Sequence, residues 1–153
     1  MTGPIRVILA DDHALVRMGF KMLLENEPDI KVVAEVDSGE KACDLIFDQS
    51  IDFDILVIDL TMQGISGIET TRRILEARPD TKILGLSAHE DPSYIRHMLH
   101  AGASAYLSKR SAPTCSLPRP MRLCDRVSYA PHKRAEVRTV TRVHRTEYRI
   151  NVP

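Results

Sequence analysis

Five polar residues from four distant parts of the chain lie at or just after the ends of short aliphatic runs. They are Asp11, Asp12, Asp59, Ser87 and Lys109, and the runs are IRVILA, ILVID, KILGLS and AYL. Three carboxylates that meet repel one another unless a cation lies among them, and oxygen ligands favour a hard ion such as Mg²⁺. A lysine and a hydroxyl beside that ion suit the oxygens of a phosphoryl group, with Asp59 as the nucleophile that accepts it.

The aliphatic runs alternate with segments that have helical periodicity. Strands are predicted at 5–10, 30–36, 55–59, 82–87 and 105–107, and helices over 14–27, after Ser38, over 67–77 and over 92–101. Such alternation with short loops predicts one α/β domain, a doubly wound five-stranded parallel sheet with helices on both faces. Ligands of these sheets bind beyond the carboxyl ends of the strands, which is where the five polar residues lie.

Cap residues and apolar stripes locate the helices more closely. Ser38 and Asp91 are predicted N-caps, and Asp11 or Asp12 is predicted to cap the first helix. Gly102 is predicted to lie just past the end of the fourth helix. The residues predicted to face the core are Val16, Phe20, Leu23, Leu24, Ala42, Leu45, Ile46, Ile68, Thr71, Leu75, Ile95, Met98 and Leu99. The residues His97 and His100 are predicted to be exposed.

The segments ILADDHALVR, ILVIDLTMQGISGIE, ILGLSAHED and AGASAYLSK resemble the receiver domain of two-component response regulators. The wording is closest to the NarL-like branch, whose members usually carry a C-terminal helix-turn-helix of the LuxR/FixJ type. The resemblance covers residues 4–112 and implies a CheY-like, flavodoxin-like sheet in the order 2-1-3-4-5. It also implies a sensor histidine kinase as phosphodonor, and homodimerisation through the face of the fourth helix and fifth strand.

The resemblance further implies a role for each acidic residue. Asp59 would be the phosphoacceptor in a reaction that depends on Mg²⁺. Asp12 and Asp59 would bind the ion directly, with the backbone carbonyl of Thr61 as a third ligand. Asp11 would act largely through a metal-bound water. As a cap alone, Asp59 would need no such companions, and capping would suit Asp11 or Asp12 equally well.

The remaining residues that match the family would handle the phosphoryl group and report its presence. Ser87 and Lys109 would hold the phosphoryl oxygens. Tyr106 matches the aromatic switch, whose ring moves inward when the Ser87 hydroxyl shifts, although a buried edge tyrosine is also common. Thr61 and His89 lie where the family tunes the lifetime of the acyl phosphate, and both are equally well explained as plain loop residues.

The chain departs from the usual receiver pattern at two positions near the site. Met62 and Gln63 stand where the family usually has Met-Pro. Since Pro presets a turn but is not a ligand, we expect a looser loop and an intact site. Lys109 is followed by Arg110 where many receivers have a cis proline, which members of the LuxR-like branch often lack.

The C-terminal tail, residues 113–153, departs further. The first 110 residues hold 12 Lys and Arg against 18 Asp and Glu, whereas the remaining 43 hold nine against three. The tail is predicted to be disordered or non-native, and no DNA-binding domain is recognisable in it, so the receiver domain is assigned to residues 1–112. A disordered arm, a local hairpin and a non-native continuation are the alternatives. We favour the last, because three prolines exclude the helix that should cover the sheet: Pro113, Pro118 and Pro120.

Three other functions are alternatives to that of a phosphorylated transcription regulator. A stand-alone receiver would signal by protein contact, and DNA would be reached only through an output domain not visible here. A Mg²⁺-dependent phosphohydrolase with Asp59 as nucleophile commonly needs a second carboxylate two residues on, where this chain has Thr61. An Arg-rich nucleic-acid binder would act through residues 119–149. The receiver itself would be no enzyme beyond self-phosphorylation and slow autodephosphorylation.

The composition, 43% hydrophobic and 27% charged, is that of a globular protein. No apolar run reaches the ~18 residues of a membrane span, and no signal peptide is evident, so we expect a cytoplasmic protein with no membrane partner. Cys43 is predicted to be a small buried hydrophobe. The residues Cys115, Cys124, His132 and His144 match no compact zinc-ligand spacing.

Overall fold

The structure is a computed structural model, which describes residues 3–88 and 91–109. The predictions for His89, Arg110 and residues 113–153 therefore lie outside the described residues. The strands are β1 (Ile5–Ala10), β2 (Ile30–Val36), β3 (Ile55–Asp59), β4 (Lys82–Ser87) and β5 (Ala105–Ser108). The helices are α1 (Ala14–Glu25), α2 (Gly39–Phe47), α3 (Gly67–Ala77) and α4 (Pro92–His100).

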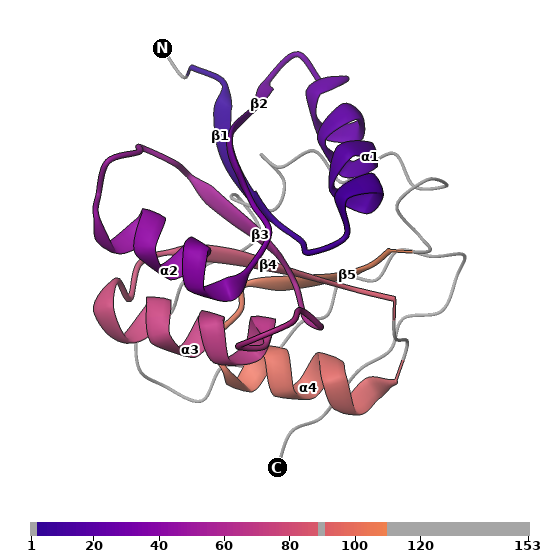
Figure 1. Ribbon diagram of the computed structural model, residues 1–153, viewed down its shortest axis with the longest axis vertical. Helices are drawn as coiled ribbons and strands as arrows, with labels where there is room; N and C mark the ends of the chain where they lie inside the picture. The colour runs from indigo at the N-terminus through magenta and orange to yellow at the C-terminus, as the bar shows by residue number, and fades with distance from the viewer. Residues whose placement is uncertain (1–2, 89–90, 110–153) are drawn as a thin grey trace.

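The five strands are parallel and form one sheet in the order β2-β1-β3-β4-β5 (Figure 1). The predicted fold class and strand order are confirmed. The first four strands have the predicted bounds, and β5 continues one residue further, to Ser108. Because β1 lies between β2 and β3, the direction in which strands are added reverses beside β1, and ligands of such sheets bind beyond the carboxyl ends of the strands at that point.

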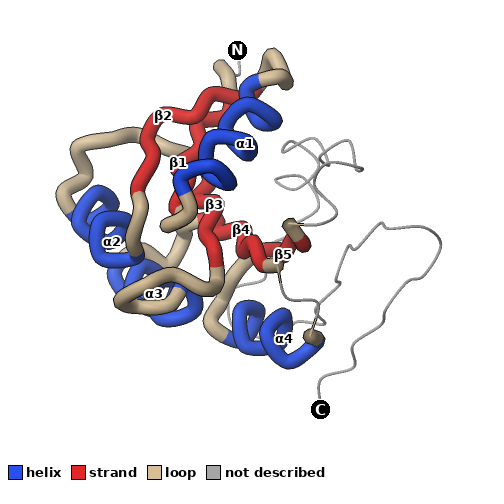
Figure 2. The backbone as a smooth tube through the Cα atoms, turned by 45° about the vertical axis from the view of Figure 1, so that its right-hand side comes forward, coloured by secondary structure: helices blue, strands red, loops and turns tan. Residues whose placement is uncertain are grey.

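Alternate side chains of the strands build a core on each face of the sheet. One core includes Ile8, Leu56, Ile58, Ala42, Ile46, Ile74 and Met98, from the strands and from α2, α3 and α4. The other includes Val7, Leu9, Val57, Phe20 and Leu24, from the strands and from α1. Figure 2 shows α1 on one side of the sheet and α2 and α3 on the other. Within the described ranges, α1 is the only helix that contributes to the second core, where Leu84 and Leu107 remain partly exposed.

Side-chain caps begin three of the helices. Ser38 Oγ accepts a hydrogen bond from the Lys41 N–H at 3.2 Å, and Asp91 Oδ1 accepts one from the Ser93 N–H at 2.8 Å, as predicted. Ser66 caps α3 in the same way, by accepting from the Glu69 N–H at 3.2 Å. These bonds satisfy N–H groups that the first helical turn leaves without a partner.

The prediction that an aspartate caps α1 is wrong. The N-cap is His13, and its side chain makes no capping hydrogen bond. Asp11 instead accepts a hydrogen bond from the His13 N–H at 2.8 Å, one residue before the helix begins. The other oxygen of this carboxylate lies 2.8 Å from Lys109 Nζ, just after the end of β5. Asp11 therefore contacts a lysine across the sheet and does not cap the helix.

Six of the thirteen residues predicted to face the core are buried, six are half-buried, and one is misassigned. Leu23 is 39% exposed, because α1 contacts the sheet through the narrow stripe of Phe20 and Leu24 and Leu23 lies at its edge. In α3 the most buried residues are Thr70, Thr71 and Ile74, so the buried face is centred slightly away from the predicted Ile68 and Leu75. Cys43, His97 and His100 have the predicted burial. No helix in the described part of the chain is long and apolar enough to cross a membrane.

The start of α3 packs directly on the backbone at the end of β3. A Cβ added at Gly67 would lie 2.1 Å from the Asp59 carbonyl oxygen and 2.9 Å from the Leu60 Cα. We expect Gly67→Ala to lower the free energy of unfolding by about 1–3 kcal/mol, the usual cost of overpacking, because backbone must move to admit the methyl group. Urea denaturation measures the change.

Gly19→Ala is the matched control, because a Cβ at Gly19 meets nothing within 4 Å. Gly19 lies in the exposed middle of α1, so this substitution should raise stability by about 0.5–1 kcal/mol. Equal stability of Gly67→Ala and the parent protein would contradict the close contact between α3 and β3.

Candidate functional site

The register of the sheet brings the ends of four strands together at one edge. Ala10 of β1 pairs with Ile58 of β3, and Asp59 pairs with Leu86 of β4. Ser87 pairs with Ser108 at the end of β5. Each strand therefore delivers its last residue, or the residue after it, to the same edge, as the sequence predicts.

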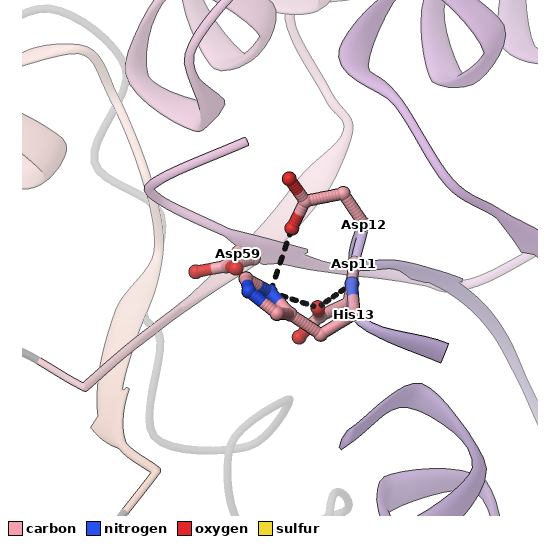
Figure 3. Close-up of side chains that lie close together, drawn as sticks. All are labelled: Asp11, Asp12, His13 and Asp59. Carbon is pink, nitrogen blue, oxygen red and sulfur yellow. Dashed lines mark hydrogen bonds and ion pairs between the residues drawn. The ribbon is translucent and has the colours of Figure 1, made fainter. Parts of the chain in front are cut away.

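Four side chains gather at this edge (Figure 3). One potential ligand atom from each of Asp11, Asp12, His13 and Asp59 lies within 4.8 Å of the others. Asp11 and Asp59 are fully buried, whereas the side chain of Asp12 is 17% exposed and that of His13 is 65% exposed. The three predicted carboxylates thus meet, and their negative charge is held where water screens it poorly.

Lys109 supplies the opposing charge. Its Nζ lies 2.9 Å from Asp59 Oδ2 and 2.8 Å from Asp11 Oδ2, so one ammonium bridges two buried carboxylates. The Lys109 N–H also donates to the Ser87 carbonyl at 2.8 Å, which fixes the lysine backbone beside β4. The lysine is therefore held in the site by its backbone as well as by its charge.

The pKa values of Asp59 and Lys109 are both raised, although burial acts on them in opposite directions. Burial raises the pKa of Asp59, and the adjacent Asp11 adds to the rise, although Lys109 opposes it. Burial lowers the pKa of Lys109, but the hydrogen bonds and charges of Asp11 and Asp59 together outweigh it, and the net pKa is raised. Asp59 is consequently a carboxylate whose charge is only partly compensated.

The loop after β3 holds the other oxygen of Asp59. The Thr61 N–H donates to Asp59 Oδ1 at 3.3 Å, and the Leu60 N–H donates to the Leu86 carbonyl at 2.9 Å. Thr61 itself is exposed. Asp59 thus has one oxygen beside a backbone donor and the other beside the lysine.

The sequence analysis did not predict two contacts of Asp12. Asp12 Oδ2 accepts a hydrogen bond from the Gln63 N–H at 3.0 Å, and Asp12 Oδ1 lies 2.8 Å from His13 Nδ1. His13 directly follows the aspartate pair, and Gln63 is a non-proline residue where receivers usually have Pro. The sequence therefore shows that both residues are unusual or close to the site. Only the folded chain shows that they contact Asp12.

The structure also places the two residues assigned to the phosphoryl group and the switch. Ser87 is fully buried at the end of β4. Tyr106 is 6% exposed and lies opposite Gly85 in the register of β4 and β5, within the same core as Met98. Both residues are therefore close to Lys109 along β4 and β5, and their roles remain predictions.

A family model described as the response regulator receiver domain matches residues 7–115. The chain belongs to this family. Its departures from the usual receiver sequence can therefore be interpreted residue by residue at the site.

Curated relatives support the family assignment. The receiver is 41% identical over 105 residues to the transcriptional regulatory protein DegU of Brevibacillus brevis, which covers 69% of this chain and 44% of DegU. It is 40% identical over 109 residues to the response regulator UvrY of Escherichia coli K12, covering 71% of this chain and 49% of UvrY. The chain spans about half the length of the curated relatives it matches.

Solved structures share the fold. The receiver domain of the putative response regulator NarL from Mycobacterium tuberculosis has a TM-score of 0.70 at 29% identity, covering 82% of this chain and 97% of that one. A LuxR-family response regulator from Aurantimonas sp. SI85-9A1 has a TM-score of 0.71 at 33% identity, covering 82% and 86%.

The donor atoms of this receiver fit a hard divalent cation. Carboxylate oxygens dominate the cluster, and the donor set that Mg²⁺ prefers is oxygen. The oxygens Asp11 Oδ2 and Asp12 Oδ1 are buried, and each lies 2.8 Å from a side-chain nitrogen, of Lys109 and His13 respectively. A cation could replace these two nitrogens as the neighbour of the buried oxygens.

Proposed function

We propose that this receiver accepts a phosphoryl group on Asp59 from a sensor histidine kinase, in a reaction that depends on Mg²⁺. The observation that carries the proposal is the environment of the Asp59 carboxylate. It is buried, and it lies 2.9 Å from the Lys109 ammonium. One of its oxygens lies within 4.8 Å of a carboxylate oxygen of Asp11 and of one of Asp12. A nucleophile, a fixed cation and a cation-binding cluster are thus adjacent.

In the proposed reaction, an oxygen of the Asp59 carboxylate attacks phosphorus and forms an acyl phosphate. The bond between phosphorus and the donor breaks, and the donor atom keeps the electron pair. Lys109 and the Ser87 hydroxyl hold the phosphoryl oxygens as charge moves onto them. Asp11, Asp12, Asp59 and the Thr61 carbonyl would hold Mg²⁺, which neutralises negative charge on the transferring group when bound.

Phosphorylation changes the charge of the site by up to about two units. Lys109 then exchanges a carboxylate partner for phosphoryl oxygens, and we propose that Ser87 and Tyr106 relay this change to the face of α4 and β5. That face would form a homodimer. Thr61 and His89 would set the lifetime of the acyl phosphate. The proposed setting is the cytoplasm.

Transcription control is the proposed output of the full-length protein, since the relatives include proteins named as transcriptional regulators. DNA would be bound by an output domain rather than by the receiver. The phosphohydrolase alternative has no support from the comparisons, whose matches are response regulators. Stoichiometry separates the two cases, because a receiver takes up one phosphoryl group per chain whereas a hydrolase turns over.

The test is labelling by acetyl phosphate in the presence of Mg²⁺. We expect one phosphoryl group per chain, detected by intact mass, and none in Asp59→Asn or in the presence of a chelator. Asp52→Asn is the control, because the Asp52 side chain is 92% exposed and outside the cluster. Labelling that persists in Asp59→Asn would disprove the assignment, as would turnover of many phosphoryl groups per chain.

A further inference from the structure

The receiver differs from most of its family at a backbone atom that contacts the site. Where receivers usually have Pro after Met62, this chain has Gln63, and the Gln63 N–H donates to Asp12 Oδ2 at 3.0 Å. A proline has no N–H and cannot make this bond. Gln63 is exposed, so its backbone, not its side chain, forms the contact with the site.

The donor lies on a loop that is itself tied down. Two residues after Gln63, the Ile65 N–H donates to Glu40 Oε1 at 2.9 Å. This hydrogen bond connects the loop to the first turn of α2. Gly64 has a φ of 82°, which an L side chain rarely adopts, so the chain can turn sharply between the two donors. The loop that carries the Gln63 N–H is therefore fixed on its C-terminal side.

The acceptor has two oxygens with different surroundings. Asp12 Oδ2 faces the Gln63 N–H, whereas Asp12 Oδ1 lies 2.8 Å from His13 Nδ1, and His13 is an exposed side chain. A charge-assisted hydrogen bond to one oxygen fixes the rotation of the carboxylate. The other oxygen, Asp12 Oδ1, is buried, and a carboxylate oxygen of Asp12 belongs to the cluster with Asp11 and Asp59.

We propose that the Gln63 N–H is a positioning group that orients Asp12 for divalent-cation binding, in place of the proline that usually shapes this loop. The inference rests on the proposed function, since it assumes that Asp12 binds the ion. Hydrogen-bond partners that orient metal ligands typically contribute 10–100-fold in affinity. We therefore expect the loop after β3 to be held by its hydrogen bond to Asp12, whereas the missing proline alone would predict a looser loop.

The experiment compares two substitutions at Gln63 in the full chain. Gln63→Pro deletes the N–H and restores the usual family residue, whereas Gln63→Ala keeps the N–H and removes the side chain. MgCl₂ is titrated into each protein, and the dissociation constant is taken from the shifts of backbone amide resonances. We expect Gln63→Pro to weaken binding by about 10–100-fold and Gln63→Ala to stay within about two-fold of the parent.

The outcomes separate the inference from the function beneath it. Binding by Gln63→Pro that is as tight as that of the parent, or tighter, would overturn the inference alone, and so would equal weakening by both substitutions. Failure of the parent protein to bind Mg²⁺ would overturn the proposed function as well. At saturating MgCl₂ the acetyl phosphate labelling rate of Gln63→Pro should recover, which a damaged fold would not allow.

A second measurement needs no substitution and covers the case in which Gln63→Pro does not fold. A scalar coupling across the hydrogen bond, between the Gln63 nitrogen and the Asp12 carboxyl carbon, is sought by NMR in the parent protein. We expect it both without and with saturating MgCl₂. Its loss when MgCl₂ is added would show that the N–H competes with the cation for Asp12, and its absence in both states would remove the contact; either result overturns the inference.

Discussion

Replacing Lys109 with Met is expected to lower the free energy of unfolding by about 3–5 kcal/mol at neutral pH, the cost of removing one partner of a buried ion pair. The reason is that a single ammonium lies 2.8 Å from Asp11 and 2.9 Å from Asp59, both of which are fully buried. Without it, two carboxylates remain close together in a poorly hydrated place. Urea denaturation measures the loss.

The pH dependence of this loss has a definite sign. Without Lys109 the pKa of Asp59 loses the influence that opposes its rise, so protonation relieves the repulsion more readily in acid. The destabilisation by Lys109→Met should therefore be smaller at about pH 5 than at about pH 8. For Lys109 itself, the raised pKa means that its contribution is present through the neutral range and is lost only as alkaline pH deprotonates it.

Controls identify the buried charge as the cause. Lys82→Met removes a lysine of similar length from an exposed position at the start of β4, and it should change stability by less than about 0.5 kcal/mol. Adding Asp59→Asn to Lys109→Met should restore part of the loss, because one of the two uncompensated carboxylates is gone. Additive losses in the double variant would be inconsistent with this account.

Asp59→Asn alone is expected to stabilise the receiver, by about 1–3 kcal/mol at neutral pH, the range for relieving a poorly compensated buried polar group. The pKa of Asp59 is raised, chiefly by burial. A group whose pKa is raised by folding favours the native state below its unfolded pKa, and this contribution is lost as pH rises through the folded pKa. Ionised Asp59 is consequently a cost, which the amide does not carry.

The measurement is the difference in urea midpoint between Asp59→Asn and the parent protein across the acid range. The difference should be small near pH 4, about the ordinary pKa of an aspartate, and grow as the pH rises through the raised pKa of Asp59. Asp54→Asn is the control of opposite sign, since Arg6 lowers the pKa of Asp54. The Arg6–Asp54 pair is partly exposed. Asp54→Asn should therefore lower the free energy of unfolding by less than about 1 kcal/mol at neutral pH, and this loss should disappear in acid.

A stabilising Asp59→Asn would have a functional meaning. The carboxylate that is proposed to accept phosphate would be one that the fold holds at a cost, and added negative charge on it would change the partners of Lys109. An unstable Asp59→Asn with no pH dependence would mean that Lys109 compensates Asp59 fully.

The strands could be predicted because the sheet is buried on both faces, whereas their order was implied by the resemblance to receivers. Continuous aliphatic runs such as ILVID mark such strands without ambiguity, and a polar residue at the end of each run marks where the strand leaves the core. Helix ends were predictable where a short-range signal exists, as for Ser38 and Asp91, whose caps depend on neighbours in the chain. Helix faces were less certain, since Leu23 lies at the edge of a stripe whose width depends on packing against the sheet.

The site divides in the same way. The sequence by itself determined which residues reach the edge of the sheet, because parallel strands all end there: Asp59 is the last residue of one strand, and Asp11 and Lys109 directly follow two others. Only the tertiary structure decided how they are paired: that Lys109 bridges two carboxylates, that Asp11 serves the site instead of the helix end, and that the Gln63 N–H contacts Asp12. The contacts of Lys109 and Gln63 join residues at least 50 positions apart, and their strength depends on burial and direction, which no local pattern of residues encodes.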